Sequence, residues 1–83
     1  MMLSNDEQLT LDAVKEIQSI KRENRKRPDF AWSFEIYNYL RYEIPEQRAL
    51  QALRSLYRRG LLEFHKDVNG NPMFGILNRN SND

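Results

Sequence analysis

The sequence lacks several features on which whole classes of protein depend. Its 83 residues contain no cysteine and a single histidine, His65. A disulfide framework, a thiolate metal site and a site built from several histidines are therefore excluded. No apolar run approaches the roughly 18 residues of a transmembrane helix, and no segment resembles a signal peptide. We therefore expect a cytoplasmic location, no membrane association and no cofactor.

A large excess of one charge is missing as well. The 13 basic and 12 acidic residues leave a net charge of +1, which is not by itself typical of a nucleic-acid-binding protein. The charges are nevertheless segregated, because the net charge is −3 over residues 1–20, +4 over 21–27, −3 over 28–47 and +4 over 48–59. Clustering of this kind builds a local field. The two basic clusters are therefore candidate contact surfaces.

The first predicted helix begins near the amino terminus and ends at about Arg25. Ser4 followed by Glu7 matches a capping box, while Thr10 is a competing start. One face of the helix is apolar and the other is charged, as expected for a helix at a domain surface. The apolar face consists of Leu9, Ala13, Ile17 and Ile20, with Val14 at its margin.

Two further helices are predicted on either side of a short break. The second covers about residues 34–42, with Ser33 as its N-cap, and follows a linker whose Trp32 we place in the core. The third begins at Pro45 and ends at Arg59, because proline suits a helix start and Gly60 suits the left-handed position after a helix. The intervening three or four residues fit helix-turn-helix geometry.

A β-hairpin is predicted after the third helix. Apolar and polar residues alternate over 61–66 and again over 73–77, and Asn69-Gly70 between them is a strong hairpin signal. We therefore predict an α+β, mainly α fold with three helices followed by a two-stranded hairpin. A chain of this length forms a single domain over 1–83, with an ordered core of about 5–77 and a flexible tail at 78–83.

This arrangement resembles the winged helix-turn-helix superfamily over about residues 9–77. Three stretches are similar to the DNA-binding half of bacterial SOS-type repressors: Leu9-Thr10, Glu35-Ile36 with Leu40, and the segment ALRSLYRRGLLE at 52–63. The resemblance implies that the third helix enters the DNA major groove and that the hairpin, or wing, touches phosphate or the minor groove. Many unrelated families share the third-helix pattern, so it implies a fold rather than a target.

The chemistry of the third helix suits this role independently of the resemblance. Arginine can form two hydrogen bonds with guanine, and glutamine can do the same with adenine. One face of the helix has suitable i, i+3/i+4 spacing and no acidic residue after Glu46. The base-contact candidates are Gln47, Arg48, Gln51 and Arg54. The phosphate-contact candidates are Ser55, Arg58, Arg59, Lys66, Asn71, Lys21, Arg22, Arg25, Lys26 and Arg27.

Two functions fit these observations. The favoured one is a small transcriptional regulator that binds double-stranded DNA without catalysis or a small-molecule ligand, and useful specificity would then require a homodimer or a protein partner. The alternative is a winged helix protein–protein interaction module of a larger nucleic-acid-processing or regulatory assembly, with Tyr39 and Tyr42 as partner-surface candidates. The arginines would then form an ordinary solvated helix face. His65 lacks partners for catalysis, so we do not expect an enzyme.

Overall fold

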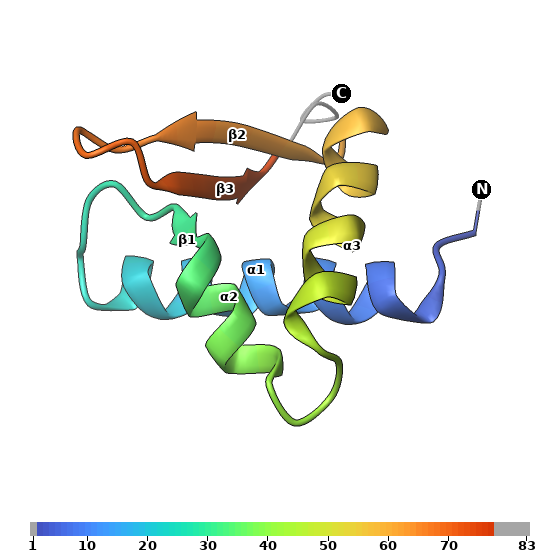
Figure 1. The fold of residues 1–83 in the computed structure, drawn as a ribbon. Coiled ribbons are helices and arrows are strands. Elements are labelled where there is room, and N and C mark those ends of the chain that lie inside the picture. Colours follow the sequence, from blue (N-terminus) through green and yellow to red (C-terminus); the bar gives the residue numbers. More distant parts are fainter. Residues whose placement is uncertain (1, 78–83) are drawn as a thin grey trace.

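A computed structural model describes residues 2–77 and arranges them as three helices and one antiparallel sheet of three strands (Figure 1). The elements in chain order are α1 (Asn5–Glu23), β1 (Ala31–Trp32), α2 (Ser33–Leu40), α3 (Glu46–Arg58), β2 (Leu62–Lys66) and β3 (Pro72–Ile76). The predicted α+β, mainly helical class is confirmed, whereas the predicted tail at 78–83 lies outside the described residues. Within residues 2–77, no helix combines the length and the apolar character needed to cross a membrane.

The sheet contains one strand more than the predicted two-stranded hairpin. The strand order is β1-β3-β2, and Ala31 pairs with Phe74 while Trp32 pairs with Met73. β1 has only two residues, too few for an alternating pattern, and the linker predicted there is therefore wrong. The strand is held in place by side chains, because Lys21 Nζ donates to the carbonyl of Phe30 at 2.7 Å.

The predicted capping box at the start of α1 is confirmed. The Ser4 backbone N–H donates to Glu7 Oε1 at 2.8 Å, and the Glu7 N–H donates to Ser4 Oγ at 3.1 Å. The predicted inner face is wrong at Ile20, whose side chain is 45% exposed, while Gln18 and Lys21 are buried. β3 packs against the C-terminal half of α1, where a backbone N–H of the sheet needs an acceptor. Gln18 Oε1 accepts the N–H of Ile76 at 2.9 Å.

The segment of α2 and α3 differs from its prediction at the boundaries, and five residues (41–45) rather than three or four separate the two helices. α2 ends two residues earlier than expected, and Ser33 is its first helical residue rather than its cap. The residue before α2 is Trp32, whose backbone N–H donates to Glu35 Oε1 at 3.0 Å. Gly60 has a φ of +77°, so the predicted left-handed position after α3 is confirmed.

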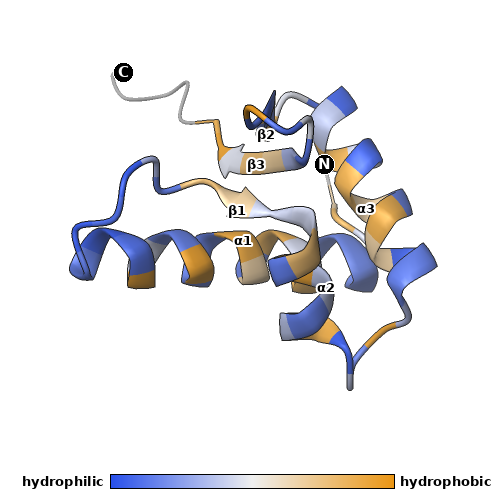
Figure 2. Cartoon of the chain, turned by 60° about the vertical axis from the view of Figure 1, so that its left-hand side comes forward, coloured by the Kyte–Doolittle hydropathy of each residue, from blue (hydrophilic) through white to orange (hydrophobic). Residues whose placement is uncertain are grey.

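The core lies where the three helices meet the inner face of the sheet. Its fully buried side chains include Val14 on α1, Ile36 and Leu40 on α2, and Leu53 and Leu56 on α3. Figure 2 shows the corresponding alternation of hydrophobic and hydrophilic segments along α1 and α3. Burial of this single face leaves the opposite side of α3 exposed, and the candidate interface lies there.

Candidate nucleic-acid interface

The side of α3 farthest from the core carries a line of polar side chains that we call the outer ridge. The buried positions of α3 are Ala49, Ala52, Leu53 and Leu56. With 3.6 residues per turn, the positions on the opposite side are 47, 51, 54 and 58. The outer ridge therefore consists of Gln47, Gln51, Arg54 and Arg58, all of them exposed. Among residues 2–77, no ion pair engages either arginine of this ridge.

A second side of α3 faces the first turn of α1, and its polar groups are already bound. Arg48 donates to both carboxylate oxygens of Asp6, through Nε at 2.8 Å and one terminal nitrogen at 2.7 Å. The guanidinium of Arg48 lowers the pKa of the Asp6 carboxyl. Arg48, which the sequence pattern indicated as a base contact, thus has an intramolecular partner 42 residues away.

Glu7 binds two more of the predicted contact residues. The Ser55 hydroxyl donates to Glu7 Oε2, and Arg59 Nε lies 3.6 Å from the same oxygen. The hydrogen bond from Ser55, followed by the backbone hydrogen bond from Ser4, lowers the pKa of this buried carboxyl. Sequence reasoning assigned Glu7 only its capping role, because no local pattern indicates a contact with α3.

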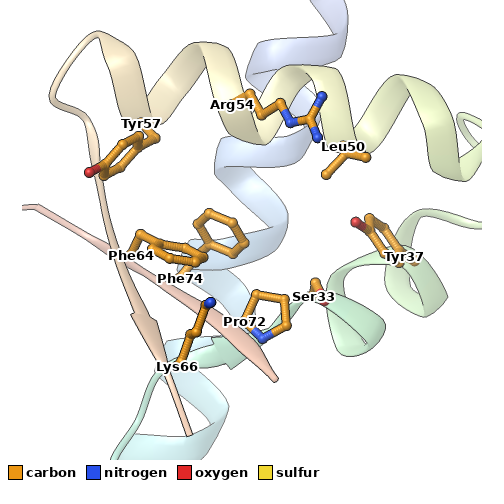
Figure 3. A pocket seen from close by; sticks show the side chains of 9 residues that line it. All are labelled: Ser33, Tyr37, Leu50, Arg54, Tyr57, Phe64, Lys66, Pro72 and Phe74. Atoms are coloured by element: carbon orange, nitrogen blue, oxygen red, sulfur yellow. The ribbon is translucent and has the colours of Figure 1, made fainter. Parts of the chain in front are cut away.

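A third side of α3 faces the hairpin across an open groove of about 360 Å³ (Figure 3). We call it the aromatic groove. Most of its lining is apolar, and the side chains come from α2, α3, β2 and β3. Its lining residues are Ser33, Tyr37, Leu50, Arg54, Tyr57, Phe64, Lys66, Pro72 and Phe74. Sequence periodicity does not indicate this groove, because its lining side chains come from four elements that are distant in the chain, and Phe64 among them is 39% exposed.

The tip of the hairpin is organised around Asp67. Its Oδ1 accepts the backbone N–H groups of Asn69 and Asn71, at 2.8 and 2.9 Å. Its Oδ2 accepts the Trp32 indole N–H at 2.9 Å and the Asn71 side-chain amide at 3.2 Å. These hydrogen bonds, with that of the Asn71 N–H first, lower the pKa of Asp67. The amide of Asn71, predicted as a phosphate contact, is thus engaged by a carboxylate, whereas Lys66 is exposed.

The basic cluster of residues 21–27 does not act as one surface. Lys21 is buried, and its ammonium lies 2.6 Å from Glu35 Oε1 and 4.5 Å from the centre of the Trp32 ring. This side chain, predicted as a phosphate contact, holds β1 and α2 to α1, and its ammonium is engaged by Glu35 and the Phe30 carbonyl. Arg22 pairs with Asp29 at 2.8 Å.

The remaining cluster residues, Arg25, Lys26 and Arg27, are exposed in the loop after α1. This loop lies at the opposite end of α1 from Asp6 (Figure 1). A 19-residue helix is about 28 Å long at a rise of 1.5 Å per residue. These three cations are therefore well separated from the contact between α1 and α3.

The two tyrosines predicted for a partner surface are exposed near the end of α2. Tyr39 is 50% exposed and Tyr42 is 87% exposed, and the Arg41 guanidinium lies 4.8 Å from the centre of the Tyr42 ring. His65 is stacked on Phe30 at a centroid distance of 4.6 Å and lies 2.8 Å from Glu63. Over residues 2–77, no group of three or more His, Cys, Asp or Glu side chains could hold a metal ion.

Comparison with known proteins adds no assignment to this geometry. Neither a protein-family model nor a curated protein matches the sequence. The candidate interface therefore depends on the arrangement of α3, the hairpin and the start of α1.

Proposed function

We propose that the domain is a winged helix that binds duplex DNA through the outer ridge of α3. The observation that carries this proposal is the line of two exposed glutamines and two exposed arginines, with no ion pair to either arginine within residues 2–77. The short turn between α2 and α3 and the hairpin that follows α3 support the winged helix assignment. The third strand, β1, pairs with β3 on the side away from β2.

The dimensions of the ridge suit the major groove. The 12 residues from Gln47 to Arg58 span about 17 Å, because each of the steps between them rises about 1.5 Å, and this corresponds to about five base pairs at 3.4 Å each. The N-terminal part of a recognition helix usually reads the base edges. Gln47 and Gln51 would therefore contact bases, and Arg54 and Arg58 would contact bases or phosphates farther along the groove.

The charge of this surface predicts modest affinity. Arg54 and Arg58 on the ridge and Lys66 on the wing are the exposed cations of α3 and the hairpin for which residues 2–77 provide no ion-pair partner. Neutralising about three phosphates gives a slope of about −3 for log K against log salt concentration. One copy would therefore bind weakly at physiological salt, and a specific complex would need a second copy or a protein partner.

A charge-matched pair of variants tests the proposal. We expect a fluorescein-labelled random-sequence duplex to bind the parent protein, as measured by anisotropy over a salt series. The change Arg54→Ala with Arg58→Ala should weaken binding at least about tenfold at low salt and reduce the salt slope by about 2. Lys15→Ala with Arg41→Ala removes the same charge outside α3 and the hairpin, and it should have a much smaller effect. Equal losses in the two double variants would rule out the outer ridge as the contact surface.

A further inference from the structure

The aromatic groove exposes apolar surface that the proposed DNA contact does not use. Tyr57 is 52% exposed and Phe64 is 39% exposed, and their rings meet at a centroid distance of 6.0 Å. The base-contact glutamines do not line the groove. Its floor of Leu50, Pro72 and Phe74 offers a phosphate no hydrogen-bond donor from a side chain. An apolar hollow of this kind on a small domain is typical of an interaction site.

The charges around the groove indicate what occupies it. Its only ionised lining residues are Arg54 on α3 and Lys66 on β2, and residues 2–77 provide neither with an ion-pair partner. The other polar groups of the lining are the hydroxyls of Ser33, Tyr37 and Tyr57. An apolar floor flanked by two cations is complementary to apolar side chains that have carboxylates beside them.

The geometry of the rings argues against stacked bases as the occupant. Phe64 is inclined by 66° to Tyr57 and by 55° to Phe74. Single-stranded nucleic acids bind to aromatic faces on which successive bases can stack, together with a groove of many cations. The inclined rings instead form a hollow between their edges and faces, which suits branched or aromatic side chains.

The size and openness of the groove favour a peptide. Its volume of about 360 Å³ is at the lower end of the roughly 300–1,000 Å³ found for ligand sites. The groove is open along the surface, so a small molecule would remain largely exposed, whereas a peptide can insert side chains and extend along the rim (Figure 3). The chain's own residues 78–83 contain no apolar side chain and could not fill it.

We infer that the aromatic groove binds a short acidic segment of a partner protein, one that inserts Leu or Phe side chains flanked by Asp or Glu. Arg54 and Lys66 would pair with the flanking carboxylates from opposite walls. The inference concerns a surface that shares only Arg54 with the outer ridge, and it does not require that the domain bind DNA.

Three matched probes test the chemistry of this site. The first is a fluorescein-labelled peptide that contains Phe and Leu flanked by Asp and Glu. The second replaces every acid by Lys, and the third replaces Phe and Leu by Ser. Anisotropy without DNA should give saturable binding of the first peptide, at least about tenfold tighter than either of the others. If the basic or the serine peptide bound as tightly, or if the acidic peptide showed no saturation at millimolar protein, the inference would be overturned.

Protein variants then locate the site. Tyr57→Ser should weaken binding of the acidic peptide at least about tenfold, whereas Phe34→Ser removes an exposed aromatic side chain that does not line the groove and should leave binding unchanged. Lys66→Glu should reduce the affinity for the acidic peptide and raise that for the basic peptide, a gain that an unfolded protein could not produce. Equal effects of the two aromatic changes, or no change of preference in Lys66→Glu, would refute the site.

Two further measurements separate this site from its alternatives. Arg58→Ala lies on the outer ridge and not in the groove, so it should weaken binding of the duplex and leave binding of the acidic peptide intact. An oligothymidine strand should not displace the labelled peptide at equal concentration. Displacement at that concentration would identify the groove as a nucleic-acid site, and self-association abolished by Tyr57→Ser would identify a second copy as the occupant. Either result would overturn the peptide assignment.

Discussion

Glu7 joins the start of α1 to the end of α3, and its replacement by alanine should cost about 2–3 kcal/mol of unfolding free energy. The side chain is only 6% exposed, and its two oxygens accept hydrogen bonds from the Ser4 backbone and the Ser55 hydroxyl. Loss of the capping interaction should cost about 1 kcal/mol. The Ser55 hydroxyl, left half-buried without its partner, should cost a further 1–2 kcal/mol or so. Arg59 is partly exposed, and its Nε lies 3.6 Å from Glu7 Oε2, so loss of this ion pair should add well under about 1 kcal/mol.

Urea unfolding followed by circular dichroism measures this loss. For a domain this small, the free energy of unfolding falls by about 1 kcal/mol per molar urea, so the midpoint of Glu7→Ala should drop by about 2 M or more. Asp12→Ala is the matched control, because Asp12 is an α1 carboxylate whose hydrogen bond comes from the exposed Gln8. That variant should remain within about 0.5 kcal/mol of the parent. A loss in Glu7→Ala no larger than in Asp12→Ala would refute the bridging role.

The pH dependence of the same site has a definite sign. The pKa of Glu7 is lower in the folded protein, chiefly because of the Ser55 hydrogen bond, so the unfolded chain takes up the proton first as pH falls. The contribution of the ionised Glu7 to the free energy of unfolding is therefore complete above the pKa of the unfolded chain, about 4.3. It is lost as pH falls through the pKa of the folded protein. Glu7→Gln cannot titrate, so its stability deficit should shrink between pH 7 and pH 3. The lowered pKa values of Asp6 and Asp67 affect both proteins alike. A deficit that stays constant would contradict the assignment.

Three further changes probe the contact between α1 and α3, the sheet and the basic cluster. Asp6→Ala should release Arg48 from its ion pair. In the anisotropy assay, the variant should bind the duplex probe more tightly, and its salt slope should be steeper by about 1. An unchanged slope would mean that Arg48 does not face DNA. Gly75→Ala places a Cβ 2.7 Å from Phe30 Cδ1 and should cost about 1–3 kcal/mol in thermal unfolding, and a value near zero would show that the Phe30 ring moves freely. Lys21→Ala should lower the free energy of unfolding in urea by about 2 kcal/mol, because Glu35 and the Phe30 carbonyl lose their hydrogen-bond donor. Lys26 is exposed, so Lys26→Ala should cost less than about 0.5 kcal/mol. Equal losses in the two variants would contradict a structural role for Lys21.

Features fixed by near neighbours in the chain could be predicted from the sequence. The capping box of Ser4 and Glu7, the left-handed Gly60 and the hairpin turn at Asn69-Gly70 each depend on a few adjacent residues, and each appears in the structure. The three helices also follow from local periodicity, with boundary errors of one or two residues. These local signals were sufficient for the class of the fold.

Features set by distant parts of the chain could not be predicted in this way. β1 is a strand only because Ala31 and Trp32 pair with the edge of β3, which follows about 40 residues later in the chain. Lys21 looks like one member of a basic cluster until its buried contact with Glu35 is known. In the same way, Arg48 looks like a free cation of α3 until its contact with Asp6 is known.

The charge that α3 presents is therefore not encoded in α3. Between Glu46 and Arg59 the segment carries four arginines and one acid, but the first turn of α1 cancels two of those arginines with Asp6 and Glu7. A synthetic peptide copying residues 46–59 would regain their full charge and would attach to any polyanion more readily than the intact domain does. Experiments on such a fragment would thus overstate the attraction of this segment to polyanions, because in the intact domain Asp6 and Glu7 pair with two of its arginines.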